Sequence, residues 1–101
     1  MGNEIVLFAR LKVKPDMIEE AMSAALAIVA DSRGESGCIN YDIHQAIDDE
    51  TTFLWHETWV DKAALDSHFA TPFFAEFFKV VERVAAEPPQ ITLTRMITQK
   101  A

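Results

Sequence analysis

The sequence predicts an α+β fold in which two helical segments interrupt four strands in the order βαββαβ. Two observations support this order. Four stretches alternate apolar and polar residues or are rich in β-branched and aromatic residues, as strands are. Between them lie stretches whose apolar residues recur at helical spacing and which begin or end at proline and glycine. With 101 residues, the chain has the length of one domain, residues 1–101.

The strands are predicted from alternation and composition. In the first stretch, alternation places Leu7, Ala9 and Leu11 on one side of the strand and the residues between them on the other. The third reads TFLWHETWV and is too short for a core helix. The predicted strands cover residues 4–14, 38–47, 52–60 and 91–99. The second should place Ile39, Tyr41, Ile43 and Ile47 on one face, and Asp48, Asp49 and Glu50 should form a solvated hairpin loop.

The helices are predicted from their caps and apolar stripes. After Pro15, a stripe of Ile18, Met22, Ala25 and Val29 indicates a helix that ends near Arg33. Asp61 can cap a short helix that runs through His68. Thr71 and Pro72 have the residue types of an N-cap and a first helical position, and Pro88 and Pro89 end the longer helix that follows.

This order is the ferredoxin-like arrangement, an antiparallel sheet with helices on one face. The other face would stay open. The third strand, however, carries apolar groups on both sides, with Trp55 and Trp59 on one and Leu54 and Val60 on the other. A solvated face would be more polar. We therefore expect two copies to pack sheet against sheet as a homodimer.

Charge and composition disfavour several classes of partner. Sixteen acidic and nine basic residues give a net charge of −7, which repels nucleic-acid phosphates and anionic membrane surfaces. No stretch has the length and apolarity of a membrane span or a secretory signal, so we expect a cytoplasmic protein. The single cysteine, Cys38, excludes an intrachain disulfide and is interpreted as a small buried apolar residue.

Several stretches, taken in order, resemble the antibiotic biosynthesis monooxygenase (ABM) family. They are the first strand with its L-x-V-K-P ending, S-R-G-E-S-G-C-I-x-Y at 32–41, H-E-T-W at 56–59, A-L-x-x-H at 64–68 and T-P-F-F at 71–74. The resemblance covers nearly the whole chain. It implies a dimeric α/β-barrel made by two ferredoxin-like subunits, with a pocket in each subunit between the sheet and the helices.

Members of this family include cofactor-independent monooxygenases of quinols and aromatic polyketides, haem-degrading enzymes, and proteins that process a signalling molecule. The resemblance would place the haem branch's Asn, Trp and His at Ala9, His68 and Phe78. None of the three matches, which disfavours haem cleavage. The histidines show no HxH, HxxxH or HExxH spacing and the glycines no phosphate-binding motif, so we expect neither a metal nor a nucleotide cofactor.

A cofactor-free oxygenase needs a dry pocket, a base and a donor that stabilises negative charge. We expect His68 to be the base, because an imidazole accepts a proton near neutral pH. A structural role at the helix end, packing against a tryptophan or bonding a carbonyl group, is the alternative. Trp59 and Glu57 complete the predicted catalytic set, with Glu57 as a pocket acid or a buried acceptor that Arg95 could pair. The predicted substrate-binding residues are Phe73, Phe74, Phe77, Tyr41 and Arg95.

Three functions remain open at this point. The first is a monooxygenase that oxidises a small phenolic, quinol or related aromatic substrate with dioxygen. The second is a dimeric ligand-binding or stress-associated protein without catalysis. The third is an isomerase or lyase that acts on a small signalling metabolite and consumes no oxygen.

Overall fold

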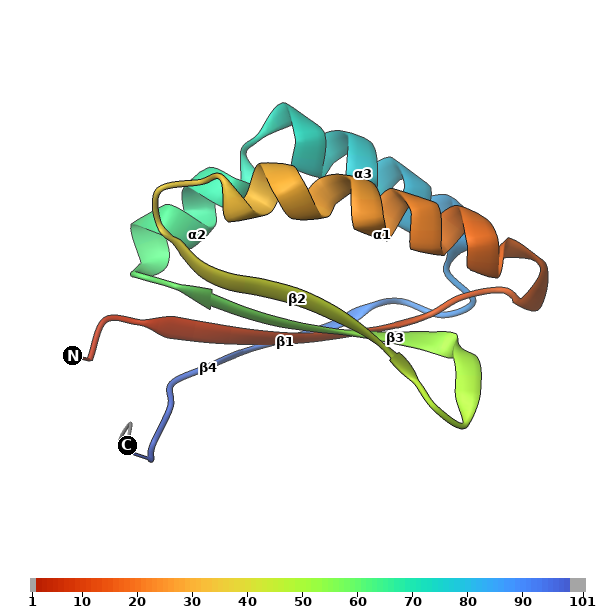
Figure 1. The fold of residues 1–101 in the computed structure, drawn as a ribbon, viewed down its shortest axis with the longest axis horizontal. Coiled ribbons are helices and arrows are strands. Elements are labelled where there is room, and N and C mark those ends of the chain that lie inside the picture. Colours follow the sequence, from red (N-terminus) through yellow and green to blue (C-terminus); the bar gives the residue numbers. More distant parts are fainter. Residues whose placement is uncertain (1, 99–101) are drawn as a thin grey trace.

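A computed structural model describes residues 2–98 of the chain (Figure 1). Four strands form one sheet and three α-helices cover it. The elements in chain order are β1 (Ile5–Lys12), the 3-10 turn η1 (Pro15–Met17), α1 (Ile18–Arg33), β2 (Cys38–Ala46), β3 (Asp49–Trp59), α2 (Lys62–Phe69), α3 (Pro72–Val84) and β4 (Gln90–Thr94). Within the described residues, no helix has the length and apolarity needed to cross a membrane.

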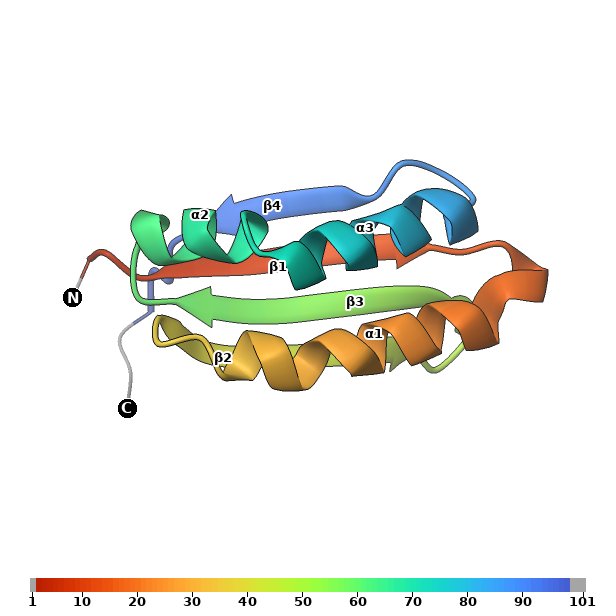
Figure 2. The same cartoon turned by 90° about the horizontal axis from the view of Figure 1, so that it is seen from above.

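The sheet confirms the predicted ferredoxin-like topology. Its strand order is β2-β3-β1-β4, and every neighbouring pair is antiparallel. All helices lie on one face of the sheet (Figure 1). Seen from above, α1 runs over β2, and α2 and α3 follow one another on the β1 side (Figure 2). The long interior between this helical layer and the sheet is where a site can be buried.

The core forms where the sheet meets the helices. Leu7 and Leu11 of β1 pair with Glu57 and Phe53 of β3, so their side chains share the face that the helices cover. Trp55 and Trp59 lie on that same face and are buried. Burying each of these large apolar side chains stabilises the fold by about 1.5–3 kcal/mol.

Both predicted helix caps of the second half are present. The Asp61 carboxylate accepts a hydrogen bond from the backbone N–H of Ala64 at 2.9 Å, which starts α2. The Thr71 hydroxyl accepts one from the N–H of Phe74 at 3.2 Å, with Pro72 at the first position of α3. Each cap satisfies a backbone donor that the helix itself cannot pair.

The predicted facing of β2 is wrong at both ends. A register shift between Cys38 and Asn40 leaves Ile39 exposed, and Cys38 takes the position opposite Trp59. One extra residue in a strand moves its side chains to the other face. Ile47 lies in the hairpin turn and is fully exposed. The half-buried Cys38 packs against the core, as expected for a small apolar residue.

The hairpin between β2 and β3 is tighter than predicted, because Asp49 and Glu50 belong to β3. The Asp49 carboxylate accepts hydrogen bonds from the N–H and hydroxyl of Thr51 and from the hydroxyl of Thr52. It also accepts one from Lys12 Nζ of the neighbouring strand at 2.6 Å. These contacts hold Asp49 in the ladder, so only the residues around 47–48 form the turn.

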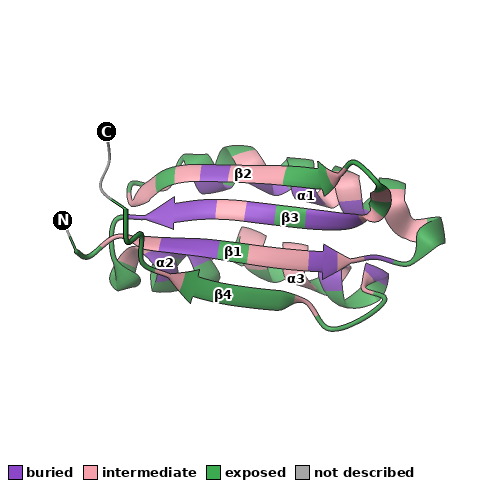
Figure 3. Cartoon of the chain, turned by 90° about the horizontal axis from the view of Figure 1, so that it is seen from below, coloured by how far each residue is buried: buried purple, intermediate pink, exposed green. Residues whose placement is uncertain are grey.

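The last strand is shorter than the predicted 91–99. β4 pairs with β1 up to Val6, opposite Thr94, and there β1 has almost reached its own start. A strand without a partner cannot continue the ladder. Residues 95–98 leave the sheet and cross its helix-free face over the ends of β1 and β3 (Figure 3). Gln99 lies outside the described residues.

The helix-free face carries exposed apolar side chains, as the two-sided apolar pattern predicted. Phe8 of β1 is 49% exposed and Leu54 of β3 is 40% exposed. Their registers place both on the side away from the helices. Phe8 stacks on His56, with ring centroids 5.2 Å apart. His56 and Glu57 therefore point to opposite faces of β3.

Candidate active site

A small cavity of about 50 Å³ lies between the sheet and α3. Its wall is apolar and largely aromatic, with Glu57 as its one ionisable carboxyl group. The lining residues are Leu7, Leu11, Tyr41, Trp55, Glu57, Phe69, Phe74, Phe77, Phe78, Val81, Pro89 and Ile91. A cavity with this composition excludes most water and presents one acid to whatever enters it.

Glu57 reaches this wall because it follows the alternation of β3 toward the helices. Only 5% of the residue is exposed. Its Oε1 accepts a hydrogen bond from Trp59 Nε1 at 3.0 Å. Burial raises the pKa of Glu57 to about 7, the Trp59 hydrogen bond opposes this rise, and the negative charge of Glu35 adds to it. Glu57 can therefore take up and release a proton at neutral pH.

Trp59 and His68 pack against one another behind Glu57. Trp59 is 0% exposed and His68 is 1% exposed, and their ring centroids are 4.5 Å apart. His68 sits in the last turn of α2, where the rings of Phe73 and Phe74 also contact it. His68, Trp59 and Phe73 do not line the cavity. Trp59 is bonded to Glu57 and His68 contacts Phe74, both of which do line it.

The imidazole of His68 has a defined partner. Its Nδ1 lies 2.6 Å from Oε2 of Glu35, in the turn between α1 and β2. Burial lowers the pKa of His68, although the Glu35 carboxylate opposes this effect. The ring is therefore neutral at pH 7. A carboxylate can only accept, so Nδ1 carries the proton that bonds to Glu35.

Tyr41 lines the cavity and is one of its few residues with a polar side chain. Its oxygen accepts a hydrogen bond from Trp55 Nε1 at 3.1 Å. Burial and the nearby Glu57 raise the pKa of Tyr41 well above its usual range, so the phenol stays protonated. The Ser32 side chain also lies close to this phenol oxygen. A protonated phenol can donate its own proton to another oxygen.

Known proteins share the sequence pattern and the fold of this chain. Residues 4–80 match the family model for antibiotic biosynthesis monooxygenase. The chain belongs to this family. It is 36% identical over 92 residues to "Putative monooxygenase YcnE" of Bacillus subtilis, covering 91% of this chain and 97% of that protein. The solved structure of PA3566 from Pseudomonas aeruginosa superposes with a TM-score of 0.90 and 32% identity, covering 97% and 98% of the two chains.

A longer relative also matches. The protein sll1783 of Synechocystis is 37% identical over 92 residues. The match covers 91% of this chain but only 63% of that protein, so the chain spans less than two thirds of this relative's length.

The stretches by which the chain resembles the antibiotic biosynthesis monooxygenase family meet around the cavity. The stretch 32–41 supplies Glu35 and Tyr41, and 56–59 supplies Glu57 and Trp59. The stretch 64–68 ends at His68, which contacts both Glu35 and Trp59. These segments come from different elements, and the fold brings their polar groups to one end of the core.

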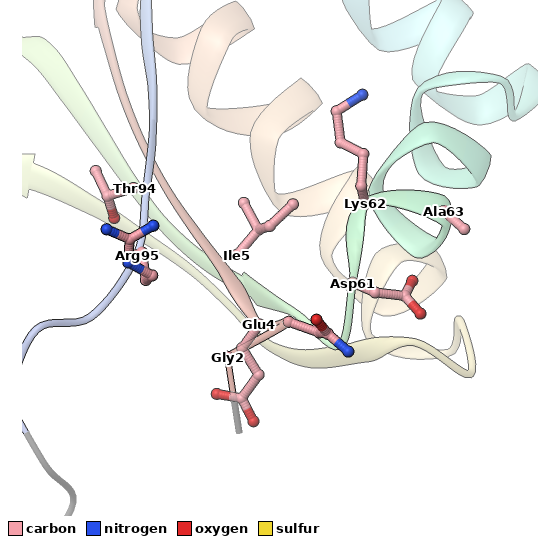
Figure 4. A pocket seen from close by; sticks show the side chains of 9 residues that line it. Gly2, Glu4, Ile5, Asp61, Lys62, Ala63, Thr94 and Arg95 are labelled. Atoms are coloured by element: carbon pink, nitrogen blue, oxygen red, sulfur yellow. The ribbon is translucent and has the colours of Figure 1, made fainter.

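Arg95 does not join this group. It follows β4 and lines a separate hollow of about 490 Å³ at the edge of the molecule, opposite Asp61 and Lys62 (Figure 4). The expected pairing of Arg95 with Glu57 is absent from the described contacts, because β4 ends at Thr94 and Trp59 already binds the carboxyl group. This larger hollow is open to solvent, and Lys62 on its wall already forms an ion pair with Asp66.

The aromatic second half of the chain does line the cavity, through Trp55, Phe69 and Phe78 in addition to Phe74 and Phe77. The sequence did not single out Glu35, which holds His68. Glu35 lies within the stretch 32–41 that resembles the family. This location is the one feature of the sequence that points to a role for Glu35. In residues 2–98, no group of three His, Cys, Asp or Glu side chains is arranged to hold a metal ion.

Proposed function

We propose that this protein is a cofactor-independent monooxygenase that oxidises a small phenolic, quinol or related aromatic substrate with dioxygen. One observation carries the proposal. A carboxyl group with a pKa of about 7 is the single carboxylic acid on the wall of an apolar, aromatic cavity. Such a group can remove a hydroxyl proton from a flat aromatic molecule in a water-poor site. Membership of the antibiotic biosynthesis monooxygenase family supports the same reaction class.

The proposed reaction begins with proton transfer. Glu57 takes the hydroxyl proton, and Tyr41 donates a hydrogen bond to the oxyanion that forms. The electron-rich anion reduces dioxygen and bonds to it, which gives a peroxide on a ring carbon. Glu57 returns its proton to the peroxide, the O–O bond breaks, and the ring carbon loses its hydrogen as water leaves. In sum, substrate and O₂ give water and a product with one oxygen in place of two hydrogens.

The base in this proposal is Glu57, and His68 has another role. His68 lies behind Trp59 and does not line the cavity. Its proton-bearing Nδ1 is directed to Glu35. A general base must come within hydrogen-bond reach of the proton that it removes, and Glu57 meets this condition for a molecule in the cavity.

An aromatic substrate needs more room than this structure provides. A cavity of about 50 Å³ is well below the roughly 300 Å³ at which ligand pockets begin. We propose that the rings of Phe74, Phe77 and Phe78 move outward on binding. Pro89 and the half-exposed Ile91 lie beside them, where the chain passes from α3 to β4. This edge is the proposed entrance.

We propose a homodimer as the working form. The exposed Phe8 and Leu54 on the helix-free face would be covered by the same face of a second copy. The cavity lies on the other side of the sheet, so each subunit would keep its own site.

An oxygen electrode tests the proposed reaction. With a soluble dihydroxynaphthalene as the probe, the protein should consume oxygen, and kcat/KM should rise as pH increases through about 7. Glu57→Gln keeps a hydrogen-bond acceptor for Trp59 but cannot take a proton. It should lower kcat/KM at least about 100-fold, the usual contribution of a general base. Glu82→Gln, on the exposed side of α3, is the matched control.

Other outcomes would assign the protein differently. Full turnover by Glu57→Gln would rule out this base. Product formation without oxygen uptake would indicate an isomerase or lyase. Binding of the probe without any product would indicate a ligand-binding protein.

A further inference from the structure

We propose that Glu35 and His68 form a positioning pair, which orients Trp59 and, through it, the carboxyl group of Glu57 at the cavity wall. The inference rests on the proposed role of Glu57 as the base. It assigns a role to Glu35 and His68, which lie outside the cavity. The pair would act through Trp59 and not by touching the substrate.

The geometry forms a continuous path from the surface to the cavity. Glu35, partly exposed in the turn before β2, lies 2.6 Å from Nδ1 of His68. His68 packs on the ring of Trp59, and Trp59 Nε1 donates to Oε1 of Glu57 at 3.0 Å. Burial of Trp59 and His68 leaves these rings little freedom. Trp59 thus holds one carboxyl oxygen of Glu57, a residue that lines the cavity.

The same path has an electrostatic consequence. The titratable groups around Glu57 are Tyr41 and Cys38 on β2, Glu35 in the turn before it and His68 on α2. Burial raises the pKa of Cys38 to about 11 and keeps Tyr41 protonated, while His68 is neutral at pH 7. Of these groups, Glu35 is the one whose negative charge acts on Glu57. Because His68 is neutral, its hydrogen bond to Glu35 leaves the negative charge of Glu35 in place.

Glu35 and Trp59 therefore act on Glu57 with opposite signs. The charge of Glu35 favours the protonated carboxyl group, and the indole N–H of Trp59 favours the carboxylate. Removing the charge should make Glu57 a stronger acid, and removing the N–H should make it a weaker acid. A purely structural role would give a different result, because loosening the core admits water and moves Glu57 toward its ordinary acidity in both variants.

The test is a carbon-13 NMR titration of the Glu57 carboxyl carbon in the full chain without substrate. Glu35→Gln should lower the midpoint by at least about half a pH unit. Trp59→Phe, which keeps an aromatic ring, should raise it. Glu35→Asp retains the charge and should titrate closer to the wild type than Glu35→Gln, and Glu82→Gln should leave the midpoint unchanged.

The midpoint of kcat/KM against pH should shift in parallel with the NMR midpoint. An unchanged or higher midpoint in Glu35→Gln would overturn the inference, as would a fall in both Glu35→Gln and Trp59→Phe. If Trp59→Phe does not fold, the comparison of Glu35→Gln with Glu35→Asp still tests the inference. The predicted NMR shifts without any oxygen uptake would support the pair and reject the proposed function.

Discussion

Glu57 links the chemistry of the cavity to the stability of the fold. Its pKa rises from about 4.5, its ordinary value, to about 7 in the folded protein. The folded state thus binds a proton more tightly than the unfolded chain between these values. The free energy of unfolding should fall as pH rises through this window, because Glu57 must lose its proton and become a buried charge in the folded protein. Above the window the free energy should level off, since Glu57 is then ionised in both states.

Glu57→Gln should remove this dependence. The variant should gain stability relative to the wild type as pH rises from 5 to 8, by up to about 3 kcal/mol. Urea unfolding at both pH values measures the difference, and Glu82→Gln should show none. His68 is present in all three proteins, so its contribution cancels in the comparison. An equal effect of Glu57→Gln at pH 5 and pH 8 would contradict the raised pKa.

The turn between α1 and β2 depends on a close approach to α2. A β-carbon added at Gly37 would lie 2.3 Å from Cβ of Ala64, and the Gly37 carbonyl accepts the N–H of Val60 at 2.9 Å. Glycine is needed here because a side chain does not fit between turn and helix. The same turn carries Glu35, so this contact also sets where Glu35 meets His68.

Gly37→Ala should lower the free energy of unfolding by about 1–3 kcal/mol, the usual cost of overpacking. Gly34→Ala is the matched control, since its added β-carbon would be 3.4 Å from the Ala30 carbonyl oxygen, close to ordinary contact. It should change stability by no more than about 0.5 kcal/mol. Chemical denaturation of both variants measures the effect, and equal stability would show that the turn can move away from α2.

The molecule as a whole has one covered and one bare sheet face. The helices bury the face with Trp55 and Trp59, while on the other face residues 95–98 pass over the ends of β1 and β3 (Figure 3). Exposed Phe8 and Leu54 on a face of this size favour association with a second copy. In a symmetric interface the same patch of both copies takes part, so a substitution on this face enters the interface twice.

Leu54→Glu should therefore separate the proposed dimer, because it places two unpaired charges in an apolar interface. Sedimentation velocity at micromolar concentration should show a dimer for the wild type and a monomer for the variant. Ile47→Glu, in the fully exposed hairpin turn, should remain a dimer. A wild-type monomer, or a Leu54→Glu dimer, would contradict this assembly.

Most of the secondary structure could be predicted because local patterns determine it. Alternation placed Glu57 on the face of Trp59, and Asp61 and Thr71 marked the starts of α2 and α3 through hydrogen bonds to residues three positions away. Errors arose where a local pattern depended on a distant partner. Asp49 stays in β3 because Lys12 of the adjacent strand binds its carboxylate. Strand β4 stops at Thr94 because β1 offers no further pairing.

The site was less predictable than the fold. Composition and the family resemblance indicated a pocket and several of its residues, among them Tyr41, Phe74 and Phe77. Neither composition nor the resemblance predicted that Glu57 lines the cavity while His68 packs behind Trp59. Glu35 and His68 are 33 positions apart, and their contact exists only after the turn before β2 packs against α2. Periodicity is a property of neighbours in the chain, whereas burial and pKa depend on groups that folding brings together from distant segments.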